Sequence, residues 1–179
     1  RKTARLMKMA EDFELPLISF IDTPGAYPGI ESEERGMSEA IAKNLSLLSN
    51  LKTPIIVIIT GEGGSGGALA IGIGDHVCML EHSIYAVASP EACASIVWRD
   101  GSKAKDAAEA MKVDASNLQN LGLVDEVIEE PLGGAHRDIR GVSNSISQVI
   151  EKKLLTFDEV DISDLLNKRY EKIMSYGSI

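Results

Sequence analysis

The sequence is poor in aromatic residues, in cysteine and in long apolar segments. Aromatic side chains make up 4% of the 179 residues, which does not favour a surface that stacks nucleobases or sugar rings. The longest apolar segment, residues 54–60, has the length of a strand, far short of the roughly 20 residues that a membrane-spanning helix requires. We therefore expect neither a membrane-embedded protein nor an aromatic binding face.

Cysteine and positive charge are also scarce. The two cysteines, Cys78 and Cys93, form no CxxC motif, so their spacing indicates neither a zinc site nor a disulfide framework. Two scattered thiols suit a reducing compartment. The net charge of −9 argues against a protein that binds the nucleic-acid backbone, because such a protein needs a basic face. We expect no metal site on this chain and no nucleic-acid partner.

The N-terminal segment has the pattern of an interior helix. Residues 1–14 start without an initiator methionine, and their apolar residues recur at helical spacing rather than in the uninterrupted run of a signal peptide. We interpret the chain as an N-terminally truncated piece of a longer protein. Its length and its 44% hydrophobic content suit a single globular domain over residues 1–179.

Strands and helices alternate along the chain, which predicts an α/β fold with a largely parallel sheet. Residues 55–59 are apolar on both faces, as expected of a buried parallel strand. The expected strands are 15–22, 55–59, 76–88 with a break near 81–82, and 124–128. The expected helices are 1–14, 33–49, 68–74, 91–98, 103–111, 116–121, 138–155 and 161–175. Turns are expected at 23–29 and 61–67.

The Gly-rich segment 61–67 carries the strongest chemical signal, and three functions compete for it. The first is a nucleotide P-loop, but Gly67 and Ala68 stand where its lysine and its hydroxyl residue are required. The second is a dinucleotide fingerprint. Gly61-x-Gly63-x-x-Gly66 follows a strand, and Glu81 lies about 20 residues further on, where a ribose-binding acid would stand. The short, glycine-interrupted helix that follows speaks against this function.

The third function is an oxyanion hole. A turn without Cβ atoms lets backbone N–H groups approach a ligand closely, and the N-terminus of a helix adds the positive end of its dipole. One such donor lowers the barrier to a developing oxyanion by roughly 3–4 kcal/mol. The alternative without chemistry is that the glycines only allow a helix to pack closely against a strand. The residues alone do not decide between these two.

Five stretches, taken in order, identify a family. They are Asp22-Thr-Pro-Gly-Ala-Tyr-Pro-Gly29, Glu33-Glu-Arg-Gly36 with Ser38-Glu-Ala-Ile41, Gly61-Glu-Gly-Gly-Ser-Gly-Gly-Ala-Leu-Ala70, Ser89-Pro-Glu-Ala-Cys-Ala-Ser-Ile96 and Pro131-Leu-Gly-Gly-Ala-His-Arg137. Together with the ending from Arg169 to Gly177, they closely resemble the carboxyltransferase alpha subunits of bacterial and plastid acetyl-CoA carboxylases. The resemblance covers essentially the whole chain, but the N-terminal region of family members is missing.

The resemblance implies a crotonase-like (ClpP/crotonase) fold of repeated ββα units and a transferase activity. The enzyme would move a carboxyl group from carboxybiotin to acetyl-CoA, giving malonyl-CoA in the first committed step of fatty acid biosynthesis. Its partners would be a beta subunit in an α2β2 heterotetramer, the biotin carboxyl carrier protein and biotin carboxylase, in the cytoplasm or the plastid stroma. Biotin would be attached to the carrier, and the zinc of this enzyme to the beta subunit.

Two alternatives stay open beside this interpretation. One is another crotonase-type subunit, either an acyl-CoA carboxyltransferase for a different substrate or a decarboxylase. The other is an interaction module that is inactive by itself.

By motif match, the resemblance assigns the oxyanion-hole donors to the backbone N–H groups of Gly66 and Gly67. They would stabilise negative charge on the ureido oxygen of biotin, while a matching pair on the beta subunit holds the acetyl enolate. The candidate substrate-binding residues are Gly25, Tyr27, Gly63 and Gly64. Tyr27 lies in a turn at the end of a strand, where α/β proteins bind ligands, although its ring suits a packing role equally well.

The three histidines give no functional signal. His76, His82 and His136 are far apart in the sequence and lack the spacing of metal ligands. We expect each of them to be a surface residue or a hydrogen-bonded core residue.

Overall fold

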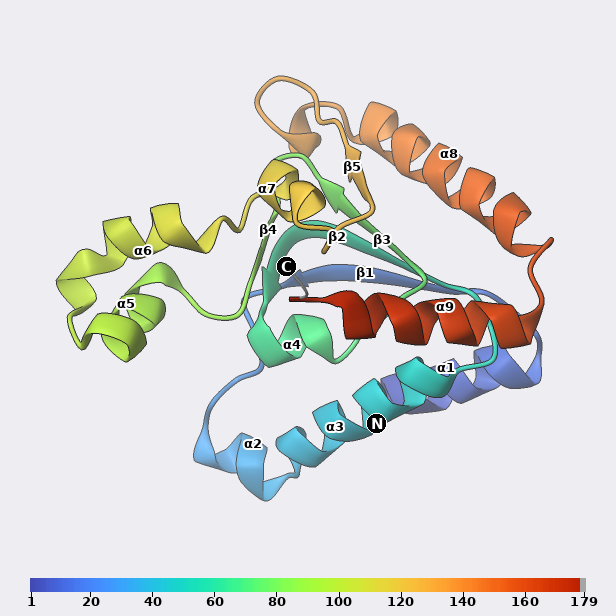
Figure 1. Ribbon diagram of the computed structural model, residues 1–179, viewed down its shortest axis with the longest axis horizontal. Coiled ribbons are helices and arrows are strands. Elements are labelled where there is room, and N and C mark those ends of the chain that lie inside the picture. The colour runs from blue at the N-terminus through green and yellow to red at the C-terminus, as the bar shows by residue number, and fades with distance from the viewer. Residues whose placement is uncertain (178–179) are drawn as a thin grey trace.

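A parallel sheet with helices on both faces organises the chain, as the computed structural model of residues 1–177 shows (Figure 1). The strands are β1 (Leu17–Thr23), β2 (Ile55–Gly64), β3 (His76–Leu80), β4 (Ile84–Ala86) and β5 (Glu126–Ile128). The α-helices are α1 (Lys2–Asp12), α2 (Ile30–Glu34), α3 (Met37–Asn50), α4 (Ser65–Leu69), α5 (Pro90–Trp98), α6 (Ala104–Met111), α7 (Ala115–Asn120), α8 (Ile139–Phe157) and α9 (Ile162–Ser175). Two 3₁₀ turns, η1 (Gly101–Lys103) and η2 (Ala135–Arg137), complete the order.

The strand order is β1-β2-β3-β5, with β4 paired to the far end of β2. Every one of these pairings is parallel. The first half of β2 lies between β1 and β3, and its second half pairs with β4 from Glu62↔Ile84 to Gly64↔Ala86. The predicted parallel α/β sheet is therefore confirmed.

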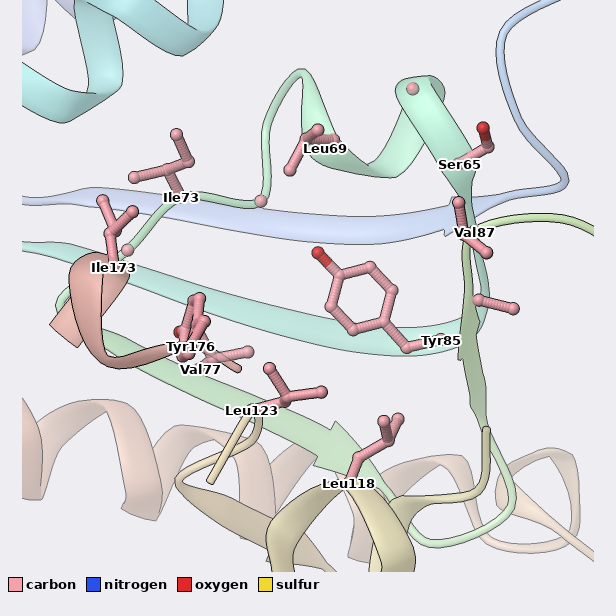
Figure 2. A pocket seen from close by; sticks show the side chains of 14 residues that line it. Ser65, Leu69, Ile73, Val77, Tyr85, Val87, Leu118, Leu123, Ile173 and Tyr176 are labelled. Carbon is pink, nitrogen blue, oxygen red and sulfur yellow. The ribbon is translucent and has the colours of Figure 1, made fainter. Parts of the chain in front are cut away.

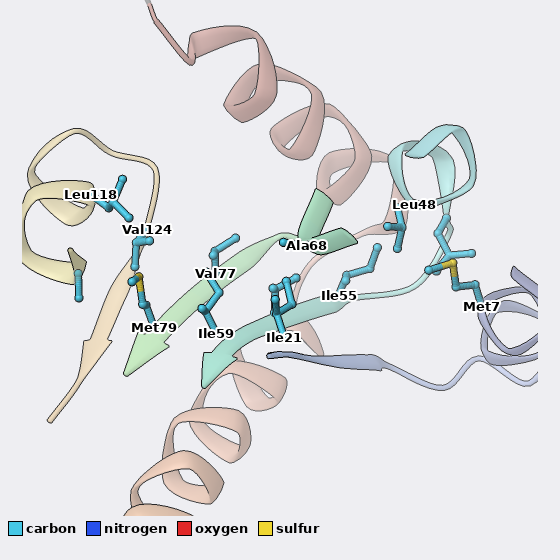
Figure 3. Close-up of a cluster of buried hydrophobic side chains, with 13 residues drawn as sticks. Met7, Ile21, Leu48, Ile55, Ile59, Ala68, Val77, Met79, Leu118 and Val124 are labelled. Carbon is cyan, nitrogen blue, oxygen red and sulfur yellow. The ribbon is translucent and has the colours of Figure 1, made fainter. Parts of the chain in front are cut away.

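The central strand separates two apolar clusters, because its side chains point alternately to opposite faces. Ile55, Val57 and Ile59 join the cluster under α1, α3, α4 and α7, part of which Figure 3 shows. Ile56 and Ile58 join the cluster under α8. All five are fully buried, as the uninterrupted apolar run predicts for a strand covered on both faces.

Helix α9 is anchored to the sheet by a buried arginine. The guanidinium of Arg169 donates hydrogen bonds to the backbone carbonyls of Leu48 and Leu51 at 2.8 Å and of Thr53 at 3.0 Å. These carbonyls belong to the end of α3 and the segment before β2. The second half of α9 is thereby held next to the end of α3 and to the loop before β3.

Three expectations about element boundaries are wrong. The helix expected over 33–49 is divided at Gly36, whose φ of +72° is not helical, into α2 and α3. Residues 61–64, expected as a turn, continue β2 because β4 pairs with them. The helix expected over 68–74 is α4 (Ser65–Leu69), which begins and ends earlier, and two glycines of low helix propensity follow it.

The ends of the remaining helices were predicted to within about three residues. The two helices expected at the end of the chain are α8 and α9. The segment expected as a strand pair over 76–88 forms β3 and β4, which pair with different parts of β2 rather than with each other. Within residues 1–177, every helix is too short or too polar to cross a membrane.

Candidate active site

The two Gly-rich segments, 23–29 and 61–67, touch each other at the end of the sheet. A Cβ atom on Gly64 would lie 2.1 Å from the carbonyl oxygen of Pro24, and one on Gly67 would lie 2.6 Å from the carbonyl carbon of Gly25. Both distances are far below any van der Waals contact. Gly64 and Gly67 are therefore required for the packing of the two segments, whatever else they do.

Gly66 stands in a different environment. A Cβ atom at this position would meet only the Cδ1 atom of Ile41, at 3.4 Å. Contacts with neighbouring residues therefore do not require a glycine at position 66. Gly66 lies on the wall of a cavity.

The backbone N–H groups of Gly66 and Gly67 are free to bind a ligand. Both residues belong to the first turn of α4, where N–H groups have no intrahelical acceptor. No hydrogen bond from either group is made to any residue among 1–177. Because α4 has only five residues, its summed dipole is small, and the two groups act as individual donors rather than through a long helix dipole.

An apolar cavity of about 430 Å³ lies beside these donors (Figure 2). The start of α4 forms one wall, the end of α9 forms another, and residues around α7 form a third. The lining residues are Ser65, Gly66, Leu69, Gly72, Ile73, Gly74, Val77, Tyr85, Ala86, Val87, Leu118, Leu123, Ile173 and Tyr176. Such a cavity suits a ligand with an apolar body and few polar atoms.

Tyr85 on β4 is the most central polar side chain of this cavity. Figure 2 shows its hydroxyl directed into the cavity on the side of Leu69 and Ile73. Its ring lies against Gly63, where a Cβ atom would be 2.8 Å from the Cδ2 atom. Burial raises the pKa of the Tyr85 phenol, so the hydroxyl keeps its proton and can donate a hydrogen bond to a ligand.

Tyr176, which follows α9, adds a second phenol to the lining. Burial raises its pKa to about 12, and the negative charge of Asp125 adds to this shift. Sequence reasoning missed both tyrosines. Tyr85 belongs to no motif and Tyr176 lies in the C-terminal stretch, and their approach depends on the pairing of β4 with β2 and on the anchoring of α9.

The predicted substrate-binding residues are distributed unevenly around the site. Gly25 has a φ of +138° and lies against Gly64. Gly63 lies under the ring of Tyr85. Gly25, Gly63 and Gly64 do not line the cavity directly. Tyr27 lies outside it with 73% of its surface exposed, and its ring covers the position where Gly29 would carry a Cβ atom.

An acidic residue that the sequence did not single out supports the Gly-rich segment. The carboxylate of Asp22, at the end of β1, accepts a hydrogen bond from the backbone N–H of Glu62 at 3.0 Å. A Cβ atom on Gly61 would lie 2.4 Å from the same carboxylate oxygen. Asp22 therefore fixes the path of the chain into the donor turn without reaching the cavity.

Comparison with known proteins gives a consistent picture. Residues 1–177 match the family described as acetyl co-enzyme A carboxylase carboxyltransferase-like. The chain is 56% identical to the acetyl-coenzyme A carboxylase carboxyl transferase subunit alpha of Alcanivorax borkumensis, covering 100% of this chain and 55% of the relative. It is 58% identical to the protein of that name from Azotobacter vinelandii, covering 99% and 56%. The chain thus spans about half the length of these curated relatives.

Solved structures with similar folds belong to enzymes that act on acyl-CoA and related acids. A transcarboxylase 12S structure matches with a TM-score of 0.66 at 24% identity, over 82% of this chain and 30% of that one. A Pseudomonas malonate decarboxylase hetero-tetramer in complex with coenzyme A matches with a TM-score of 0.69 at 17% identity, over 93% and 67%. At such identities the similarity shows the fold alone, and it confirms the predicted crotonase-type α/β fold.

Proposed function

The chain belongs to the acetyl co-enzyme A carboxylase carboxyltransferase-like family, and from this premise we propose that it is the catalytic domain of a carboxyltransferase alpha subunit. The reaction moves a carboxyl group from carboxybiotin, carried by the biotin carboxyl carrier protein, to acetyl-CoA and forms malonyl-CoA. The relatives of 56–58% identity, all named as this subunit, support this substrate over another acyl-CoA.

The observation that carries the proposal is the unpaired backbone N–H group of Gly66 on the wall of an apolar cavity, with the unpaired N–H group of Gly67 next to it in the chain. Carboxybiotin supplies an activated carboxyl group when it is bound. The N–H groups of Gly66 and Gly67 donate hydrogen bonds to the oxygen that gains negative charge as this group leaves. Each such donor contributes roughly 3–4 kcal/mol to transition-state stabilisation.

The other residues of the site position the ligand. The phenols of Tyr85 and Tyr176 remain protonated and provide further donors in an otherwise apolar lining. Gly25, Gly63 and Gly64 allow the two Gly-rich segments and the Tyr85 ring to approach closely. We propose that the exposed Tyr27 contacts the biotin arm or the partner subunit.

A partner subunit completes the site in this proposal. Val87 lines the cavity and has 77% of its surface exposed. The neighbouring helix α5 exposes Ile96 at 76% and Val97 at 61%, and α5 and α6 project away from the sheet (Figure 1). Exposed apolar side chains next to a ligand cavity suit a subunit interface. We propose that the carboxyltransferase beta subunit covers this surface in an α2β2 assembly and contributes the donors for the acetyl enolate.

The proposed setting follows from the family. The carrier protein would receive its carboxyl group from biotin carboxylase, with biotin attached to the carrier and not to this chain. The complex would supply malonyl-CoA for fatty acid synthesis in the cytoplasm or the plastid stroma. Within it, this chain would form one carboxyltransferase domain.

The reverse reaction tests the proposal. The native polypeptide is mixed with its beta subunit, malonyl-CoA and a soluble biotin analogue, and acetyl-CoA is quantified. We expect acetyl-CoA only when both subunits are present. A parallel assay with methylmalonyl-CoA in place of malonyl-CoA tests whether the enzyme acts on a different acyl-CoA. An assembled complex that turns over methylmalonyl-CoA but not malonyl-CoA contradicts the substrate assignment, and one inactive toward both contradicts the enzymatic function.

A further inference from the structure

A cluster of potential metal ligands lies on the face of the sheet opposite the cavity. His76 and Cys78 are two residues apart on β3, so their side chains point to the same face. Glu126 on β5 is the direct register partner of Cys78. A nitrogen of His76, the sulfur of Cys78 and a carboxylate oxygen of Glu126 all lie within 4.8 Å of one another.

The distances and donor types suit a metal of the zinc class. The Nε2 atom of His76 lies 3.0 Å from the Oε2 atom of Glu126. Two such ligands on a tetrahedral Zn²⁺ ion, each about 2.0–2.1 Å from it, are separated by roughly 3.3 Å. The pair therefore needs little movement to accept an ion. Zn²⁺ binds imidazole, thiolate and carboxylate ligands, whereas Mg²⁺ and Ca²⁺ prefer oxygen ligands alone.

A second carboxylate lies near the other ring nitrogen of His76. The Oδ2 atom of Asp125 lies 3.7 Å from Nδ1 of His76. The same carboxylate accepts a hydrogen bond from the backbone N–H of Val77 at 2.6 Å and an ion pair from Lys172 on α9. The contact with Nδ1 is too long for a hydrogen bond, so Asp125 adds negative charge beside the ring, and Nε2 is the nitrogen that faces Glu126.

The cluster has the burial of a structural metal site with one open side. The Cys78 side chain is fully buried in the apolar cluster under α8, and His76 is 6% exposed. The side chain of Glu126 is 30% exposed, which gives an ion a path from solvent. Because cysteine binds a metal ion as the thiolate, the ion displaces the Cys78 proton when the sulfur binds.

We propose that His76, Cys78 and Glu126 bind one divalent transition-metal ion of the zinc class, with water as the fourth ligand, and that this ion ties β5 to β3. On binding, the S–H bond of Cys78 breaks, its proton passes to solvent, and a sulfur–metal bond forms. The ion would stabilise the outer strand β5, which only three residue pairs join to β3. Leu118 and Leu123 of the cavity lie just before this strand, so the ion would also support one cavity wall.

The site escapes sequence inspection because its ligands come from two strands. The segments that contain them are about 50 residues apart in the chain and are brought together by the parallel pairing of β3 and β5. The proposal is independent of the carboxyl-transfer function, since none of its residues lines the cavity.

Cobalt(II) titration of the full-length polypeptide tests the site, because a thiolate bound to Co²⁺ gives a charge-transfer absorption band. The protein is first treated with a chelator. We expect the band to grow to one equivalent of Co²⁺ and to vanish when Zn²⁺ is added. The Cys93→Ser variant, which changes the only other cysteine of this chain, should behave as the unchanged protein does, whereas Cys78→Ser should give no band.

A second variant covers the case in which Cys78→Ser fails to fold. Glu126→Gln removes one ligand at a partly exposed position, and we expect it to weaken Zn²⁺ binding at least tenfold, measured by competition against a chromophoric chelator. Zn²⁺ should raise the melting temperature of the unchanged protein but not that of the variant. Absence of a cobalt band, its persistence in Cys78→Ser, or equal Zn²⁺ affinity of Glu126→Gln and the unchanged protein would overturn the proposal.

Discussion

Arg169 and Asp75 form a two-point ion pair that fixes the last helix against the sheet. The Nε and Nη2 atoms of the arginine lie 2.8 Å and 2.7 Å from the two carboxylate oxygens of Asp75. The two side chains are 0% and 4% exposed. The end of this helix supplies Ile173 and Tyr176 to the cavity, so the pair holds a wall of the candidate site in place.

Replacing Arg169 by methionine should lower the free energy of unfolding by about 3–5 kcal/mol. The change leaves the Asp75 carboxylate buried without its cationic partner and removes one donor from each of three backbone carbonyls. Denaturant unfolding measures the loss. Lys168→Ala, at the exposed neighbouring position, is the matched control and should change stability by less than about 0.5 kcal/mol. Equal stability of the two variants would contradict the role of the pair.

The two glycines of the donor turn should respond differently to alanine. In Gly67→Ala the new methyl group collides with the backbone of Gly25 and Ala26, and overpacking of this kind costs about 1–3 kcal/mol. Gly66→Ala meets only the flexible end of Ile41 and should keep both stability and carboxyl transfer, because its N–H group is retained. Thermal melting and the acetyl-CoA assay check both variants. A Gly66→Ala protein that fails to fold would contradict this packing.

The Tyr85 hydroxyl should contribute to ligand binding but not to folding. In Tyr85→Phe the ring still packs on Gly63, and the only loss is a donor directed into the cavity. We expect KM for the biotin substrate to rise about 3- to 10-fold, the value of one neutral hydrogen bond, with an unchanged melting temperature. Tyr170→Phe, at a 65% exposed position, is the control. An unchanged KM in Tyr85→Phe would show that the phenol does not touch the ligand.

Asp114 should make helix α7 sensitive to acid. Its carboxylate caps α7 and accepts hydrogen bonds from the Asn117 side chain, the Ser116 hydroxyl and the Asn117 backbone, which lower its pKa to about 2. The folded-state pKa lies below the ordinary value of 3.8. The stabilisation is therefore present above about pH 4 and is lost as the pH falls toward 2.

Unfolding measurements at two pH values test this cap. Asp114→Ala should cost about 1 kcal/mol near neutral pH, the usual value of an N-cap. The difference from the unchanged protein should shrink as the pH approaches 2. A difference that does not vary with pH would mean that the carboxylate charge plays no part in the cap.

The central strand and the long helices can be predicted from the sequence because local patterns determine them. The β-branched run from Ile55 to Ile59 predicts a strand covered on both faces, and all of its residues are fully buried. The periodic closing helices were likewise predicted nearly to their observed limits. These elements follow from hydrophobic periodicity, which needs no knowledge of distant contacts.

The details of the site depend on contacts between distant residues, and the sequence predicts them less well. Gly61 to Gly64 show no strand propensity, yet they continue β2 because β4 pairs with them. Tyr85 reaches the cavity through the same pairing. Arginine is rarely buried, and the acceptors of Arg169 lie more than 90 positions away in the chain. Motif similarity indicated the donor turn, but not the lining of the cavity beside it.

The central claim is that the Gly66 N–H group stabilises developing negative charge, and a single-atom change tests it most directly. Incorporating glycolic acid at position 66 replaces the N–H by an ester oxygen and adds no atom to the packing. With the unchanged beta subunit, the account predicts a fall of about 10²–10³ in the rate of acetyl-CoA formation. The melting temperature should stay the same, since this N–H group bonds to no residue among 1–177. An ester protein that transfers carboxyl groups as fast as the Gly66→Ala variant would contradict the claim.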